Sequence, residues 1–178
     1  STLVNFGTLE IRNSLALGAV DSTPPLVTAF ANSSVNGTAV AANATLRLVK
    51  PVGGANVEVD GEVLTLAGSL FTTVNNGFTL QNNSGNNLWT GPVILANGAV
   101  GGVVLIDTAT DLTLFGAVTN LLTSANPVGL LKSNAGKLQF AGSEANAYFG
   151  TTTVLAGLLE LNKTGAISLA GNVVVGNL

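Results

Sequence analysis

The strongest candidates for chemistry are three carboxylates, Glu58, Asp60 and Glu62, spaced two residues apart. In an extended strand, alternate side chains share a face, so neighbouring carboxylates would lie about 6.5 to 7 Å apart along one side. Such a row could hold a calcium ion with help from carbonyl oxygens and water. A solvated outer face explains the same spacing, and we favour it because no aspartate-rich calcium loop accompanies these residues.

Other catalytic arrangements are restricted by what the chain lacks. It contains no His and no Cys, which excludes Ser-His-Asp and Cys-His catalysis and the usual zinc sites. Carboxylate pairs, as in glycosidases, remain available. Asp107 and Asp111 would share a strand face, but we expect a turn or edge role for them. We predict that the chain is not an enzyme and requires no cofactor.

Two aromatic residues and a threonine run offer further surface chemistry. Trp89 and Tyr148 occupy equivalent places in a short repeat and could form a platform for sugars. Packing at the end of a coil is the better explanation, since each is followed two residues later by Gly. The run 151–153 is Thr-Thr-Thr, but it does not recur as an ice-binding face would require.

The composition indicates strands and tight turns. Hydrophobic residues make up 47% of the 178 residues and charged residues only 8%, against about 25% charged in ordinary domains. Asparagine, threonine and glycine number 20, 20 and 22, and they supply neutral polar groups and turn formers. A chain this rich in Val, Leu and Ile is not disordered. The net charge of −3, with six scattered cations, argues against a nucleic-acid partner.

Hydrophobic alternation predicts an all-β fold. Period-two patterns surround Val57 and Leu112. Further strands are predicted at 8–11, 44–49, 63–66, 77–80, 93–95, 103–106, 137–140, 152–155, 158–161 and 172–175. The segment 119–131 comes nearest to a helical pattern, but Pro127 limits it. The uncharged segment 63–106 contains too many amide side chains for a membrane span.

Internal repeats favour stacked coils over other all-β architectures. The segment 2–10 matches 152–160 at Thr, Val, Gly, Leu and Glu, an offset of 150 residues, and the pattern Asn-x-aromatic-x-Gly occurs at 87–91 and 146–150. In stacked coils each strand pairs with those above and below, and ladders of asparagine would explain the asparagine count. With about 20 to 25 residues per coil, we expect about eight coils and a rod of about 40 Å.

One block of the sequence resembles a known repeat. The run 131–142 (LKSNAGKLQFAG), followed by 146–154 (NAYFGTTTV) and Gly-Leu-Leu at 157–159, resembles the autotransporter-associated β-strand repeat of bacterial passenger domains. The segments 64–68 and 84–95 look like the upstream parts of proteins that carry this repeat. Asn134 and Lys137 stand where the family usually has Gly and Thr.

The resemblance implies a right-handed parallel β-helix, here a single domain over 1–178, exposed on a bacterial surface or outside the cell. We therefore expect a structural or adhesive stalk or filament, and a segment or repeat unit of a longer or polymeric fibre. Its expected partners are tandem neighbours or further copies bound through the terminal coils, and a surface glycan or host-cell ligand. Two alternatives remain: a carbohydrate-binding or carbohydrate-cleaving β-helix, and a viral or phage fibre shaft.

Overall fold

The computed structural model describes residues 1–18, 37–69, 78–97, 102–120 and 127–176. These residues form three parallel β-sheets and no helix. Sheet A contains β1 (Thr2–Val4), β3 (Thr38–Val40), β6 (Leu64–Gly68), β9 (Val93–Asn97) and β12 (Val118–Asn120). Sheet B contains β2 (Gly7–Ile11), β4 (Ala44–Val49), β7 (Leu80–Ser84), β10 (Val103–Thr108), β13 (Gly129–Ser133), β15 (Thr152–Val154) and β17 (Val173–Val175). Sheet C contains β5 (Glu58–Val59), β8 (Asn87–Trp89), β11 (Leu112–Leu114), β14 (Lys137–Gly142) and β16 (Leu158–Lys163).

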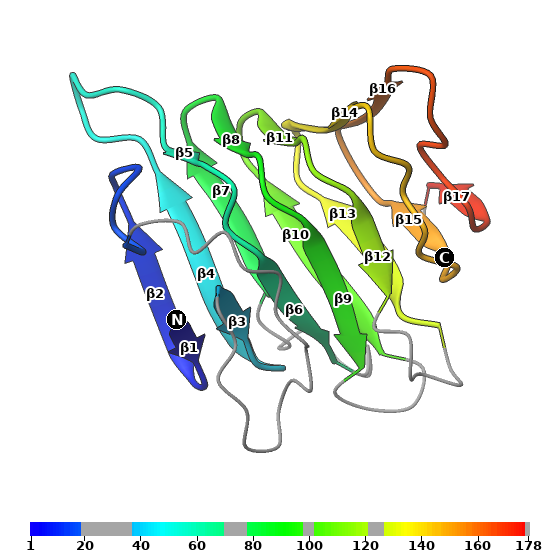
Figure 1. Ribbon diagram of the computed structural model, residues 1–178, viewed down its shortest axis with the longest axis horizontal. Coiled ribbons are helices and arrows are strands. Elements are labelled where there is room, and N and C mark those ends of the chain that lie inside the picture. The colour runs from blue at the N-terminus through cyan, green and yellow to red at the C-terminus, as the bar shows by residue number, and fades with distance from the viewer. Residues whose placement is uncertain (19–36, 70–77, 98–101, 121–126, 177–178) are drawn as a thin grey trace.

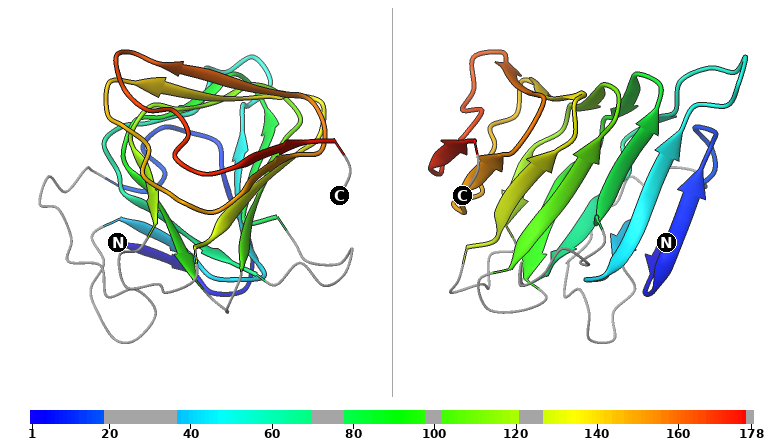
Figure 2. Two further views of the ribbon diagram at one scale, coloured as in Figure 1. Left: turned by 90° about the vertical axis from the view of Figure 1, so that its right-hand side faces the viewer. Right: turned by 180° about the vertical axis from the view of Figure 1, so that it is seen from behind.

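From β3 to β14 the chain visits the three sheets four times in the order A, B, C. Before this, β1 and β2 belong to sheets A and B, and afterwards β15, β16 and β17 alternate between sheets B and C, so consecutive strands always belong to different sheets. Each inner strand of a sheet pairs in parallel with the strand one circuit earlier and with the strand one circuit later, and each edge strand pairs with one of them. We call one such circuit a level. Figure 1 shows the levels side by side from blue to red, and the end view in Figure 2 shows the three sheets around a common interior.

The levels become shorter toward the C-terminus. Successive partners in sheet B are 37 residues apart from Leu9 to Leu46 but 22 apart from Lys132 to Val154. The expected 20 to 25 residues per coil therefore describes the C-terminal levels only. The largest sheet has seven described strands, against about eight coils expected, and six steps of about 4.8 Å give a stack of about 30 Å.

The core consists of apolar columns that run from level to level. In sheet B the column includes Leu46, Leu80 and Ile106, all without exposed surface. Parallel columns from sheets A and C, the latter with Trp89 and Phe140, belong to the same buried cluster. Burial of apolar area at about 25 cal/mol per Å² makes this shared interior the main source of stability.

Glycine and asparagine lie at the corners, where the chain leaves a strand of one sheet and enters a strand of another. A Cβ atom on Gly116 would lie 2.3 Å from the carbonyl oxygen of Gly91, so only glycine permits the levels to approach this closely. The expected asparagine ladders are wrong for the described strand pairs, because Asn82 pairs with Leu48 and Thr108. Buried asparagines bond instead to the backbone of turns.

The repeat at an offset of 150 residues encodes a local strand–glycine–strand unit. Gly7, the first residue of β2, has φ of 72°, and Gly157, between β15 and β16, has φ of 71°. The first unit connects sheet A to sheet B, whereas the second connects sheet B to sheet C. The two copies therefore share a conformation but occupy different corners of the stack.

Candidate functional site

The three carboxylates do not share one strand face, so that prediction is wrong. Strand β5 contains only Glu58 and Val59, and Gly61 turns the chain with φ of 63° before β6 begins. The carboxylates nevertheless border one cavity of about 370 Å³. The described residues that line it are Ser14, Leu15, Gly18, Glu58, Val59, Asp60 and Glu62, and among these there is no cation and no aromatic ring.

Two of the three carboxylates, Asp60 and Glu62, already have a hydroxyl partner. Asp60 Oδ1 accepts a hydrogen bond of 2.6 Å from the hydroxyl of Thr90. Glu62 Oε1 accepts one of 2.5 Å from Thr38, while burial raises the pKa of the Glu62 carboxyl. Among the described residues, no three His, Cys, Asp or Glu side chains are grouped so that they could hold a metal ion. The structure therefore gives no support to a calcium site at Glu58, Asp60 and Glu62.

The two aromatic residues of the short repeat are packing residues, as predicted. Trp89 and Tyr148 have no exposed surface. The indole Nε1 of Trp89 donates to the carbonyl oxygen of Glu62 at 2.7 Å. The Tyr148 hydroxyl lies 2.7 Å from Thr152 Oγ1, and its ring meets Phe140 edge to face at 6.3 Å. Burial raises the pKa of Tyr148 to about 12. Neither ring can serve as a sugar platform.

The outward face of sheet B carries a polar ladder with one residue from each of five levels: Glu10, Arg47, Gln81, Asp107 and Ser133. Arg47 Nε donates to Gln81 Oε1 at 2.9 Å, and Ser133 Oγ donates to Asp107 Oδ1 at 2.9 Å. Asp107 therefore lies within β10, which pairs with strands on both sides, so the turn or edge role expected for it is wrong. Asp111 lies in the turn between β10 and β11, as expected.

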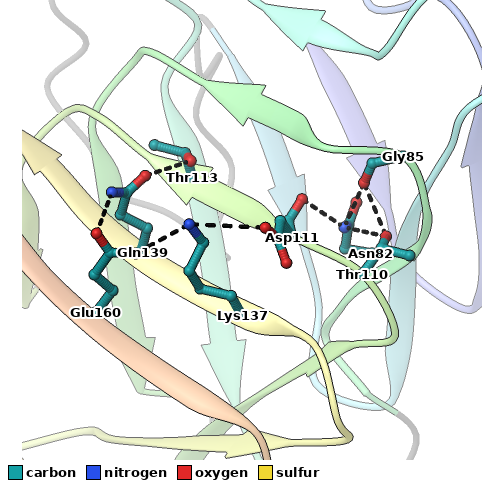
Figure 3. A network of polar contacts seen from close by, with 8 residues as sticks. All are labelled: Asn82, Gly85, Thr110, Asp111, Thr113, Lys137, Gln139 and Glu160. Carbon is teal, nitrogen blue, oxygen red and sulfur yellow. Dashed lines mark hydrogen bonds and ion pairs between the residues drawn. The ribbon is translucent and has the colours of Figure 1, made fainter.

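Sheet C carries a second ladder, shown in Figure 3. Thr113 donates to Gln139, and Gln139 donates to Glu160, each at 3.0 Å. Lys137 Nζ lies 3.0 Å from Glu160 and 3.7 Å from Asp111. Because these side chains satisfy one another, both ladders link neighbouring levels and leave few groups free for a ligand.

Beside the second ladder, a buried asparagine closes the corner between sheets B and C (Figure 3). Asn82 Nδ2 donates to the carbonyl oxygens of Gly85 and Asp111 and to the hydroxyl of Thr110, at 2.9 to 3.1 Å. Its Oδ1 accepts from Asn87 at 2.6 Å. This network joins two levels at the same corner.

Sequence reasoning missed two lysines that bind backbone carbonyl groups at corners. Lys132 has no exposed surface, and its Nζ donates to three carbonyl oxygens. Lys163 Nζ donates to the carbonyl oxygens of Phe115 and Gly116 at 3.2 and 2.9 Å. The only indication in the sequence is that Lys132 directly follows the apolar residues Leu130 and Leu131.

At the two ends of the stack, apolar side chains are exposed. At the C-terminal end, Leu161 and Val175 follow Phe140 and Val154 in the inward columns but remain 49% and 79% exposed. At the N-terminal end, Leu3 and Phe6 are 65% and 82% exposed. No described strand pairs with the outer side of β1, β2, β16 or β17. Unpaired edges with exposed apolar residues are sites at which a further strand can add.

Comparison with known proteins identifies no relative: no protein family, no curated protein and no solved structure matches the chain. The part of the chain that the structure describes contains no helix that is long and apolar enough to cross a membrane.

Proposed function

We propose that the chain is a segment of a right-handed parallel β-helix that builds an extracellular stalk, filament or adhesive surface on a bacterium. Three parallel sheets that the chain visits in rotation from β3 to β14 support this architecture, and crossovers between parallel strands are right-handed in about 98% of cases. The block that resembles the autotransporter-associated repeat forms two stacked strand–turn–strand units, β13 with β14 and β15 with β16, which agrees with this proposal.

A single observation supports the functional part of this proposal: the inward apolar columns are exposed to solvent at the C-terminal end. Leu161 and Val175 continue columns that are buried at every neighbouring level. Another level of the same kind would bury these side chains and pair the free edges of β16 and β17. This further level would come from a tandem neighbour in a longer protein or from the end of a second copy. In either case the function is the stacking of coils.

The test is electron microscopy of the purified protein at physiological salt. We expect filaments with an axial repeat that corresponds to the length of one stack. The variant Val175→Glu places a charge on the open end and should abolish them, whereas Val52→Glu, at a fully exposed position outside the strands, should not. Short rods in both wild type and variants would contradict end-to-end stacking of copies. Images with two-fold or three-fold symmetry would favour a viral or phage fibre shaft.

No observation favours the carbohydrate alternative. A sugar-cleaving or sugar-binding groove at the acidic residues would be expected to include a lysine, an arginine or an aromatic ring beside them. None of these is found among the described residues that line the cavity at Glu58, Asp60 and Glu62.

A further inference from the structure

The inward column of sheet B contains one residue that does not fit its neighbours. Leu80, Ile106, Lys132 and Val154 are successive partners in register, and all are aliphatic except Lys132. Lys132 nevertheless has no exposed surface. A buried ammonium group is stabilised only where its donors find partners, because removal from water is costly.

The partners of Lys132 are three backbone carbonyl groups at the corner between sheets B and C. Its Nζ lies 2.8 Å from the oxygen of Ser133, 2.7 Å from that of Asn134 and 2.9 Å from that of Ala156. An ammonium group has three protons, so each proton has one acceptor. Asn134 has φ of 65°, a left-handed conformation that asparagine tolerates.

The ammonium group joins two levels. Ser133 ends β13 and Asn134 belongs to the turn after it, whereas Ala156 belongs to the turn after β15, one level further along the stack. A Cβ atom on Gly157 would lie 2.8 Å from Lys132 Nζ and 2.5 Å from the oxygen of Asn134. The turn of β15 therefore closes over the ammonium group only because residue 157 is glycine.

No carboxylate neutralises this charge directly. Lys132 is absent from the ion pairs formed by the described residues. Burial lowers the pKa of Lys132, and the negative charge of Asp107 raises it by a smaller amount. Asp107 itself bonds to the Ser133 hydroxyl. Neutral carbonyl oxygens thus provide the direct contacts.

We infer that this corner is a carbonyl-lined binding site for a primary ammonium group, that Lys132 is its built-in occupant, and that occupancy holds β15 and β16 on the stack. The inference does not depend on the proposed filament. The described part of the chain contains no cluster that could hold a metal ion. The inferred cation site is filled instead by a side chain of the protein itself.

The test is chemical rescue in the full chain. Lys132→Ala removes the side-chain atoms beyond Cβ, which correspond to n-propylammonium, and leaves the three carbonyl groups in place. Hydrogen exchange of amides in β15 and β16 should accelerate at least about tenfold, as expected for loss of charge-assisted hydrogen bonds. Addition of n-propylammonium chloride should restore protection. Tetramethylammonium chloride, which has no N–H donor, should not, and Lys50→Ala, at an exposed lysine, should behave as wild type.

A second variant separates charge from packing. Lys132→Met fills a similar volume without an ammonium group, so we expect the same faster exchange in β15 and β16. Wild-type protection in Lys132→Met would overturn the inference, as would equal rescue of Lys132→Ala by both ammonium salts. If Lys132→Ala does not fold, the same two salts are compared for recovery of the β-sheet circular dichroism spectrum, and selective recovery by n-propylammonium is expected.

Discussion

Glu62 shows how a carboxylate is used in a chain with few charges. It lies at the corner before β6 and accepts a hydrogen bond from Thr38, one level away. Its own carbonyl oxygen accepts from the indole of Trp89. Residue 62 therefore contacts two other levels, one through its side chain and one through its backbone. Its role is to close a corner, and the hydroxyl partner partly offsets the cost of burial.

This position predicts a specific pH dependence. Burial raises the native pKa of Glu62 above its ordinary value of 4.5, so Glu62 contributes most stability below that value and loses the contribution as pH rises through the native pKa. Glu62→Gln keeps an acceptor for Thr38 but cannot ionise. Relative to wild type, it should gain about 1 kcal/mol or less in unfolding free energy between pH 3.5 and pH 7, measured by denaturant titration.

The control is Glu58→Gln, because Glu58 is exposed and borders the same cavity. Glu58→Gln removes a carboxylate from the border of the cavity while the hydrogen bond between Glu62 and Thr38 stays in place. A Glu62→Gln variant that loses stability relative to wild type between pH 3.5 and pH 7 would show that ionised Glu62 is favoured in the native state.

At the scale of elements, the two strand–glycine–strand units allow the cost of a left-handed backbone conformation to be measured separately from the cost of steric contacts. Gly7 and Gly157 have nearly identical φ angles of 72° and 71°. A Cβ atom would meet no other atom within 4 Å at Gly7, but at Gly157 it would lie 2.4 Å from the oxygen of Gly136. The same substitution thus tests backbone strain alone at one site and strain with steric conflict at the other.

We predict that Gly7→Ala costs about 1 kcal/mol of unfolding free energy, the penalty for a left-handed alanine. Gly157→Ala should cost at least about 2 kcal/mol more, because a close approach between levels must be opened. Denaturant titration of both variants measures the difference. Equal costs would mean that the corner above Lys132 relaxes freely around a methyl group.

The same scale shows what the sequence could and could not predict. The alternating pattern at 44–49 predicted β4 with its observed bounds, and in the structure every residue of this strand except Arg47 is buried. The segment 119–131 overlaps β12 and β13. These strands were not predicted, because the apolar residues of the segment do not alternate clearly with polar ones. Asn87 and Lys132 were missed as corner residues because their partners are backbone groups of the adjacent level, 30 and 24 residues away in the chain, which no spacing in the sequence reveals.

The whole molecule is a stack in which each level contacts its neighbours. The densest contacts join adjacent strands of one sheet, such as β14 with β16 and β10 with β13. The described ion pairs all involve partly exposed side chains, which contribute little each. Stability therefore comes from columns and ladders between adjacent levels, as in other quasi-one-dimensional proteins.

Such a stack should lose stability locally when one level is damaged. Phe140, fully buried in β14, packs against Tyr148 of the next level, and Phe140→Ala should cost about 3 to 5 kcal/mol. Hydrogen exchange should accelerate in β14, β15 and β16 while β2 and β4 retain most of their protection, because coupling passes only between neighbours. Phe149→Ala, at a position 68% exposed, is the matched control and should leave exchange unchanged. Equal loss of protection at β2 and β16 would mean that the stack unfolds as one cooperative unit, and that the ladders on sheets B and C transmit stability over its full length.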